Sequence, residues 1–380
     1  MITPVRPTIL HLAAVEFTAT NLLSPQLAAL QDAGFDVRVG CRPGPSGFDP
    51  ALASFRPVNV DFPRQIDPVA MVKASRRLLG ELREMRPAAI HLHTPAVAQP
   101  LRCIPRRLFP PGIKVFYTVH GFAHLWDTGK LKDAVLERTE RLLAHRTHMM
   151  LFQSSEDFDN SQSHHYRTKL RYLGNGVGDE WFALPAAPRP NKGLRALFVG
   201  RLIRDKGIID LLKALTRAPE IKLTIVGEQL PSDRGGAAEE VTRLIEHEDL
   251  AGRVRRAGRL SQPELRQEML ATDVVVLPSY REGVPRALIE GLAAGRPLVA
   301  TTTRGCRELI TDGVNGFLVP TGQPDRLAEA LRSLATMSPD RFKAMGVASK
   351  QRALASHREQ MVFDRLISCY AEEGIHPVRM

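Results

Sequence analysis

The sequence predicts an α/β protein made of two similar halves, each a doubly wound parallel sheet with helices on both faces. Short apolar runs alternate with longer stretches of helical periodicity along the chain, which is the pattern of repeated βα units. The segment from Ala183 to Lys192 contains three prolines, ends both periodicities and has the composition of a linker. A chain of 380 residues is long enough for two or three domains with separate cores.

In the first half, short apolar and β-branched runs predict five strands, at Ile9–Ala13, Val37–Gly40, Ala89–His93, Lys114–Val119 and Met149–Gln153. Apolar residues at helical spacing predict helices between them, at Asn21–Ala33, Val69–Met85 and Leu131–His145. Residues 1–185 are therefore expected to form an N-terminal domain.

The second half repeats the pattern, with strands expected near residues 195, 223, 254, 274, 298 and 317. After Pro320 the spacing becomes mostly helical, with helices expected at residues 325–335, 339–355 and 360–373. Residues 186–357 are therefore expected to form a second domain.

Two carboxylates, Glu282 and Glu290, lie eight positions apart after the apolar run Val274 to Leu277. This order predicts Glu282 in the turn after a buried strand and Glu290 in the following helix. Ligands of open α/β sheets bind at the carboxyl ends of the strands, so a small ligand is expected beside both side chains. Helix capping by a carboxylate explains the pair equally well when it is taken alone.

Two turns indicate that the expected ligand contains phosphate. Gly283 and Pro285 should open a helix with a tight turn and leave backbone amides free for an anion. Upstream, an expected strand ends at Gly200 and is followed by Arg201 and Lys206, two cations that suit a diphosphate. Standing alone, these cations would indicate only solvated loop charges.

Five motifs follow one another in the second half: GRL...KG at Gly200–Gly207, VGE at Val226–Glu228, AG at Ala257–Gly258, VVVLPSYREGVPRALIEGLAAGRPLVAT at Val274–Thr301 and NGFLVP at Asn315–Pro320. In these motifs the chain resembles the retaining glycosyltransferases of family 4. The resemblance implies the GT-B fold, in which two Rossmann-like domains enclose a cleft. It also implies that the last helix, within residues 358–380, crosses back onto the first domain.

The resemblance further implies transfer of a sugar from a nucleotide diphosphate to a hydroxyl group, with the anomeric configuration retained. Glu282 is expected to hold hydroxyls of the donor sugar and Glu290 those of the ribose, because carboxylates are strong acceptors. Arg201 and Lys206 are expected to stabilise the departing diphosphate. The nucleotide base of the donor is expected near Leu260. The expected donor site comprises Gly200, Arg201, Lys206, Leu260, Glu282, Gly283, Val284, Pro285 and Glu290.

The first half bears a looser resemblance to the branch of this family that builds cell-surface polysaccharides. It is carried by AVEFTATNLLSPQLAALQDAGFDV at Ala14–Val37, YTVHGF at Tyr117–Phe122 and GNGVGDEWF at Gly174–Phe182. His120 matches the family's active-site histidine, which lies at a strand end facing the donor sugar. Spacing alone would favour this role only weakly over a histidine in a polar turn.

No metal or other cofactor is expected, since the nucleotide sugar is a co-substrate. Asp157 and Asp159 spell the D-x-D signature of metal-binding glycosyltransferases of a different fold. The serines before them instead favour an N-cap and an acidic first helical turn. Four cysteines without CxxC spacing argue against a zinc cluster or a disulfide framework and favour the cytoplasm. The apolar patch near the N-terminus lacks the features of a signal peptide, and no apolar run is long enough to span a membrane.

The net charge of +11 raises the question of polyanionic partners. Residues 64–107 hold nine cations and three anions, and the helix from Val69 to Met85 is amphipathic. This segment is expected either to rest on an anionic membrane surface or to be an ordinary solvated face. Nucleic-acid binding is not expected, because no aromatic side chains interleave the basic cluster.

The sequence therefore predicts a retaining glycosyltransferase in the cytoplasm, peripheral to the inner face of the cell membrane. A lipid-linked saccharide is the first choice of acceptor, and a small natural-product acceptor is the second. A nucleotide-sugar epimerase or a coupling enzyme on a non-sugar donor, built on the same fold, stays an alternative. A nucleotide-sugar-binding protein without catalysis is disfavoured by the set Arg201, Lys206, Glu282, Glu290 and His120.

Overall fold

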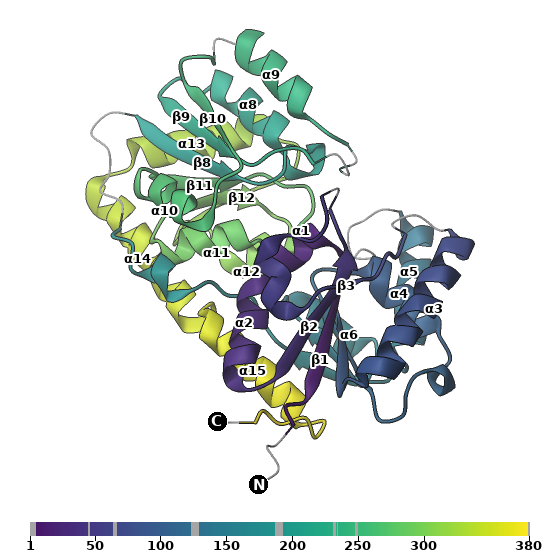
Figure 1. The fold of residues 1–380 in the computed structure, drawn as a ribbon. Helices are drawn as coiled ribbons and strands as arrows, with labels where there is room; N and C mark the ends of the chain where they lie inside the picture. Colours follow the sequence, from purple (N-terminus) through teal and green to yellow (C-terminus); the bar gives the residue numbers. More distant parts are fainter. Residues whose placement is uncertain are drawn as a thin grey trace. The chain divides into compact units, whose positions relative to one another are not determined.

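The computed structural model describes residues 5–44, 46–63, 67–122, 129–186, 193–230, 233, 235–247 and 250–378. These residues form two compact units, each with its own parallel sheet (Figure 1). Unit 1 comprises residues 1–173 and 363–380, and unit 2 comprises residues 174–362. The expected α/β fold with two Rossmann-like sheets is confirmed.

The sheet of unit 1 has seven strands in the order β3-β2-β1-β4-β5-β6-β7. The strands are β1 (Thr8–Val15), β2 (Asp36–Arg42), β3 (Val58–Asn59), β4 (Ala89–Leu92), β5 (Lys114–Val119), β6 (Met149–Phe152) and β7 (Lys169–Tyr172). Its main helices are α2 (Ser24–Ala33), α3 (Pro68–Met85), α4 (Pro95–Cys103), α5 (Lys130–Ala144) and α6 (Ser155–Ser163). In Figure 1, α4 lies between α3 and α5 on one side of the sheet. The strand order reverses between β1 and β4.

The last helix, α15 (Glu359–Ala371), ends inside unit 1. The ring of Tyr370 is fully buried and meets Phe116 edge-on at 4.8 Å. Its hydroxyl lies 2.6 Å from Nδ1 of His91. Just beyond the helix, Glu373 binds Lys114 and Lys169. The C-terminal segment is therefore part of the core of unit 1.

The sheet of unit 2 has six strands in the order β10-β9-β8-β11-β12-β13. The strands are β8 (Leu194–Val199), β9 (Ile221–Val226), β10 (Val254–Gly258), β11 (Val274–Leu277), β12 (Leu298–Thr301) and β13 (Gly316–Val319). The main helices are α8 (Ile208–Thr216), α9 (Ala238–His247), α10 (Gln262–Leu270), α11 (Arg286–Ala293), α13 (Pro324–Thr336) and α14 (Pro339–Ser356). Helix α8 packs against α9 and α13, whereas α11 packs against α14. The strand order reverses between β8 and β11.

Every strand expected from the sequence is present, and β3, β7 and α4 are among the elements of the described residues that the sequence did not predict. Strand β3 has only two residues, and β7 at the sheet edge alternates exposed with half-buried positions. Helix α4 begins at Pro95 and contains Pro100, which sequence rules exclude from helix interiors.

The units divide after Leu173, earlier than the boundary expected at residue 185. Residues 174–182 belong to unit 2 because Val177 pairs with Arg358 and Trp181 is buried in its core. The chain returns to unit 1 at Phe363, where residue 358 was expected. Of the expected linker, residues 187–192 lie outside the described residues.

Candidate functional site

The expected donor-site residues of unit 2 gather at the carboxyl ends of β8 and β11, where its strand order reverses. Lys206 follows β8 and Glu282 follows β11, and the lysine ammonium donates to the carboxylate at 2.6 Å. The Ser279 hydroxyl donates to the same oxygen at 2.7 Å. The Glu282 side chain is 8% exposed and that of Lys206 is 20% exposed. A charged pair is thus held at the position where open α/β sheets bind ligands.

Two glycines allow the loops of this site to approach closely. Gly207 has φ of +69°, and a Cβ there would lie 1.9 Å from the carbonyl oxygen of Pro278 at the end of β11. A Cβ at Gly305 would lie 1.2 Å from the carbonyl oxygen of Gly283. Only glycine fits either position, so the backbone itself brings Lys206 to Glu282.

Arg201 follows Gly200 after β8, and its guanidinium forms an ion pair with Asp233. Asp233 also accepts a hydrogen bond from the Leu230 amide at 2.9 Å. The arginine side chain is 42% exposed, whereas the aspartate is buried. Leu260 is half-buried against the core of unit 2. The aspartate partner of Arg201 was not foreseen, because it lies 32 residues downstream.

Glu290 lies inside α11 and is 2% exposed. Its carboxylate accepts a hydrogen bond from Nε of Arg286 at 3.2 Å, and Arg286 also pairs with Glu359. Burial raises the pKa of Glu290 to about 7, although Arg286 opposes this shift. Helix α11 begins at Arg286 with Pro285 as its N-cap.

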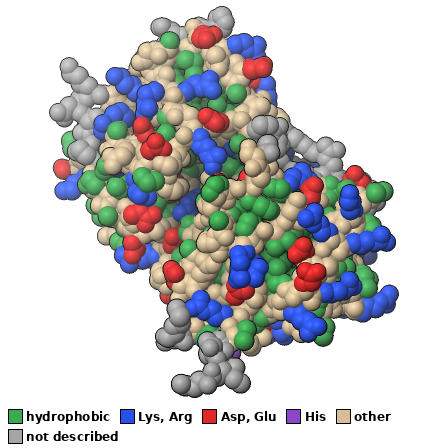
Figure 2. Space-filling model, in the orientation of Figure 1, with side chains coloured by type: hydrophobic (Ala, Val, Ile, Leu, Met, Phe, Trp, Pro, Cys, Tyr) green, Lys and Arg blue, Asp and Glu red, His purple; other side chains and the backbone are tan. Residues whose placement is uncertain are grey.

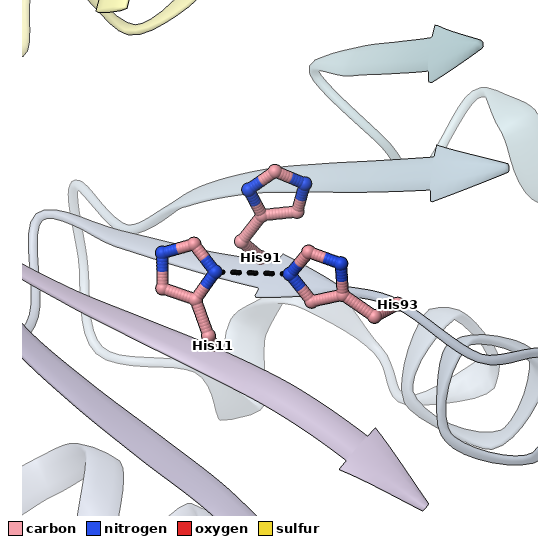
Figure 3. Close-up of side chains that lie close together, drawn as sticks. All are labelled: His11, His91 and His93. Carbon is pink, nitrogen blue, oxygen red and sulfur yellow. Dashed lines mark hydrogen bonds between the residues drawn. The ribbon is translucent and has the colours of Figure 1, made fainter. Parts of the chain in front are cut away.

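In unit 1, His120 directly follows β5, as expected. Its Nδ1 lies 2.9 Å from Oε1 of Gln153, and its Nε2 lies 3.4 Å from Nδ1 of His93. Nε2 of His93 in turn lies 2.9 Å from Nδ1 of His11 (Figure 3). Burial lowers the pKa of His120 to about 4 and that of His11 to about 3. Burial also places the pKa of His93 well below its usual value.

Sequence reasoning missed this cluster, which also contains His91. His91 lies opposite His11 in the pairing of β4 with β1, at the strand reversal of unit 1. The signal was present, because two histidines spaced by two in a strand face the same side. The rings of His11, His91 and His93 have nitrogens within 4.8 Å of one another, a separation that a metal ion could bridge. Both nitrogens of His91 are engaged, one by Tyr370 and one by Thr118.

The D-x-D sequence has a structural role, as expected. Ser154 caps α6 by accepting a hydrogen bond from the Asp157 amide at 3.1 Å. Asp157 is buried and accepts a hydrogen bond from the Phe122 amide. Its carboxylate therefore fixes the backbone just after His120.

Two family models match the chain. The Glycosyl transferase 4-like domain covers residues 22–176, and Glycosyl transferases group 1 covers residues 179–352. The chain is 29% identical over 285 residues to a Bacillus subtilis protein named as a glycosyltransferase, EpsD, covering 70% of this chain and 71% of that protein. It is 28% identical over 302 residues to glycogen synthase of Mycobacterium tuberculosis, covering 77% and 71%.

Solved structures agree in fold. Sucrose-phosphate synthase from Thermosynechococcus elongatus superposes with a TM-score of 0.81 at 20% identity, covering 97% of this chain and 99% of that one. Anabaena Alr3699/HepE in complex with UDP superposes with a TM-score of 0.77 at 17% identity, covering 96% and 100%. The chain is a GT-B glycosyltransferase of the family 4-like type.

The glycosyltransferase has the groups that an anionic ligand of unit 2 needs. Arg201 and Lys206 both follow β8 and carry positive charge, and Gly283 lies in the loop after β11. Glu282 and Glu290 supply acceptors on the β11 side. Among the described residues of the glycosyltransferase, no helix has the length and hydropathy to cross a membrane.

Proposed function

We propose that this glycosyltransferase transfers a sugar from a nucleoside diphosphate to a hydroxyl of a lipid-linked saccharide, with retention of the anomeric configuration. The observation that carries the donor part is the Lys206–Glu282 pair at the strand reversal of unit 2. A cation beside a carboxylate that accepts hydrogen bonds from hydroxyls suits a sugar diphosphate, in which negative charge and hydroxyls are neighbours. UDP bound to the Anabaena protein supports this choice of donor.

In the proposed reaction, the bond between the anomeric carbon and the diphosphate oxygen breaks, and the oxygen keeps the electron pair. Lys206 and Arg201 stabilise the growing negative charge, together with backbone amides near Gly283. The acceptor oxygen bonds to the anomeric carbon on the same face, and its proton passes to the departing phosphate. Glu282 holds hydroxyls of the donor sugar, and His120 is the residue of unit 1 proposed to bind a sugar hydroxyl.

A panel of nucleotide sugars tests the proposal. A matching donor is expected to raise the thermal midpoint of the protein, since a ligand bound only to the native state stabilises it by mass action. The same donor with a lipid-linked saccharide should yield product whose anomeric proton coupling shows retention. Isomerisation or hydrolysis without acceptor would instead support the epimerase or coupling alternative. Stabilisation without turnover of any donor would refute catalysis.

Removing Lys206 should weaken catalysis more than removing Arg201. Lys206→Ala is expected to lower kcat/KM for the donor by about a hundredfold, the usual effect of losing one preorganised charge partner. Arg201→Ala is expected to lower it by about tenfold, because its guanidinium is 42% exposed and already paired with Asp233. Steady-state kinetics measure both. Lys213→Ala, an exposed lysine in α8, is the control, and an equally active Lys206→Ala would make Lys206 a mere loop charge.

Donor binding should depend on pH through Glu290. Its pKa is about 7, and only the ionised carboxylate is a strong acceptor for ribose hydroxyls. Between pH 6 and pH 8 the ionised fraction rises about tenfold, so the donor KM should fall by about tenfold. Glu290→Gln should remove this dependence and keep a high KM throughout. A KM of the wild type that does not change with pH would contradict the role of Glu290.

The lipid-linked acceptor is proposed because unit 1 carries a basic and apolar outer surface. On α3 and α5 the structure exposes Val69, Val72, Leu131, Val135 and Leu142, each more than half exposed. Exposed cations flank them at Lys73, Arg76, Arg77, Lys132, Arg138 and Arg141. Figure 2 shows Lys and Arg side chains with hydrophobic ones where Figure 1 places these helices. This combination suits an anionic membrane face.

Not every cation of residues 64–107 contributes to this surface. Arg102 is buried and bonded to Glu140 at 2.8 Å, and Arg64 lies outside the described residues. Helix α5 was expected as a helix but not as part of the membrane surface. It supplies more exposed apolar side chains than α3.

Vesicle flotation tests the membrane surface. Binding is expected to vesicles containing phosphatidylglycerol, and not to neutral phosphatidylcholine vesicles, with loss at high salt. The double variant Arg76→Glu, Arg77→Glu should weaken binding by at least about tenfold, since each cation contributes about 1 kcal/mol. Lys343→Glu, an exposed change in α14, is the matched control. Equal binding by both variants would show that this surface does not bind the membrane, and it would favour a small, water-soluble acceptor.

A further inference from the structure

We propose that His93 and His11 are positioning residues for His120, because hydrogen bonds through their rings hold His120 in one tautomer and one orientation. The three histidines come from neighbouring parts of the unit 1 sheet: His11 lies in β1, His93 follows β4 and His120 follows β5. The role of His120 in catalysis rests on the proposed function, whereas the geometry of the hydrogen-bond chain from His11 through His93 to His120 does not.

The direction of these hydrogen bonds follows from the contact between His120 and Gln153. The Oε1 atom of Gln153 can only accept, so the His120 Nδ1 at 2.9 Å must carry a proton. In a neutral ring, Nε2 of His120 then has a lone pair, and it accepts from Nδ1–H of His93 at 3.4 Å. Nε2 of His93 likewise accepts from Nδ1–H of His11 at 2.9 Å.

The contacts of His11, the last ring of the hydrogen-bond chain, agree with this direction. Nε2 of His11 has no hydrogen-bond partner among the described residues. With protons on each Nδ1, this atom is a lone pair, and the opposite direction would require Gln153 to donate. The ring of His11 is fully buried, as are those of His91 and His93, and burial keeps such rings neutral. All three links therefore specify the same tautomer.

His91 restrains the rings from the side. It stacks on His93 with centroids 4.3 Å apart and an interplanar angle of 20°. Its own nitrogens are fixed by the Tyr370 hydroxyl at 2.6 Å and the Thr118 hydroxyl at 2.7 Å. Rotation of the His93 ring would disturb this stack and break both links of the chain. His93 is thereby held with Nδ1 toward His120 (Figure 3 shows its other link, to His11).

The chain determines what His120 offers to a sugar. Because Nδ1–H is committed to Gln153, only Nε2 can face a ligand, and it does so as an acceptor. The 3.4 Å contact with His93 is long for a hydrogen bond, so a sugar hydroxyl can share the same lone pair while His93 stays in place. His120 should therefore select a hydroxyl group rather than a carbonyl oxygen on the donor sugar.

A metal ion shared by His11, His91 and His93 is the competing explanation of the cluster. It would need one lone pair from each ring at about 2.0–2.1 Å. His91 would have to give up Tyr370 or Thr118, and His93 would lose one of its two ring partners. The hydrogen-bond chain uses the same nitrogens without any such loss.

Two variants of His93 form a matched pair for the test. The amide nitrogen of asparagine falls near the Nδ1 position of histidine, whereas the amide oxygen of glutamine can reach the Nε2 position and accept there. His93→Asn should keep the donor to His120, so kcat is expected to stay within about threefold of the wild type. His93→Gln can still accept from His11 but leaves His120 without its donor. Its kcat should fall by about tenfold or more, with a smaller change in the donor KM.

Nitrogen-15 spectra of histidine-labelled protein give a readout that does not depend on activity. The wild type and His93→Asn should show His120 as the neutral Nδ1–H tautomer. In His93→Gln the Gln153 amide can turn over and donate to Nδ1 of His120, so the spectra should show a mixture of tautomers. An Nε2–H tautomer of His120 in the wild type, or equal kcat and equal spectra for both variants, would overturn the proposal. So would a stoichiometric metal ion in the purified protein.

Folding and function are controlled separately. If both His93 variants unfold, His11→Asn and His11→Gln make the same comparison one link further away, where asparagine keeps the donor to His93. If the protein transfers no sugar, the proposed function fails, while the spectra still decide whether the chain sets the tautomer of His120.

Discussion

Replacing Glu282 by alanine is expected to abolish sugar transfer while unit 2 stays folded. The carboxylate accepts hydrogen bonds from Lys206 and Ser279 and is only 8% exposed, so nothing nearby can take over its position. Loss of both the sugar contact and the alignment of Lys206 should reduce kcat by about a hundredfold or more, equivalent to about 2.7 kcal/mol. Product formation at saturating donor concentration measures this loss.

Two controls separate charge from folding. Glu282→Gln keeps the size of the side chain and an acceptor for Ser279 but removes the charge, so it should be nearly as inactive as alanine. Glu329→Ala removes an exposed carboxylate on α13 and should be fully active. Circular dichroism should show the same helix content in all three variants. A fully active Glu282→Ala protein would refute the assignment of the donor site.

Acid should destabilise the protein below pH 6.5, because unit 1 holds a cluster of four neutral histidines, three of them buried. The folded pKa values of His11, His91, His93 and His120 all lie below the ordinary value of 6.5. As the pH falls through 6.5, the unfolded chain takes up protons that the folded protein cannot. The free energy of unfolding should then decrease by about 1.4 kcal/mol per pH unit for each histidine, until its folded pKa is reached.

For His11 and His120, whose folded pKa values are about 3 and about 4, the two contributions together should remove about 2 kcal/mol between pH 6.5 and pH 5.5, and His91 and His93 should add to this loss. Denaturant unfolding of unit 1, followed by an amide exchange probe in β1 and β4, measures this loss. His11→Asn should reduce the pH slope by about one proton. Constant stability across this pH range would show that the cluster is already charged.

Much of the fold could be predicted from the sequence, because its signals are local. The run Val274–Leu277 is fully buried in β11, and buried parallel strands are apolar throughout. Glu282 and Lys206 could be assigned to one site because both follow strands, and parallel strands end at the same edge of a sheet. Asp233 could not be assigned to Arg201, because it follows β9 in a segment without strand or helix periodicity.

The histidine cluster shows what sequence reasoning leaves out. His11 and His91 are 80 positions apart, and only the pairing of β1 with β4 brings them together. The isolated histidines therefore resembled ordinary strand residues, while His120 stood out through its motif. Helix α4 was missed for the opposite reason, because Pro100 argues locally against a helix that tertiary packing nevertheless stabilises.

The discontinuity of unit 1 has a consequence for synthesis on the ribosome. Residues 1–173 emerge first, yet their core lacks Tyr370, whose ring fills the space beside Phe116, and the Glu373 carboxylate between Lys114 and Lys169. Residues 174–362 are contiguous and can complete their own core as soon as they leave the exit tunnel. Unit 2 of the nascent chain should therefore mature before unit 1, and emergence of the segment that begins at Phe363 should be the step that closes the core of unit 1.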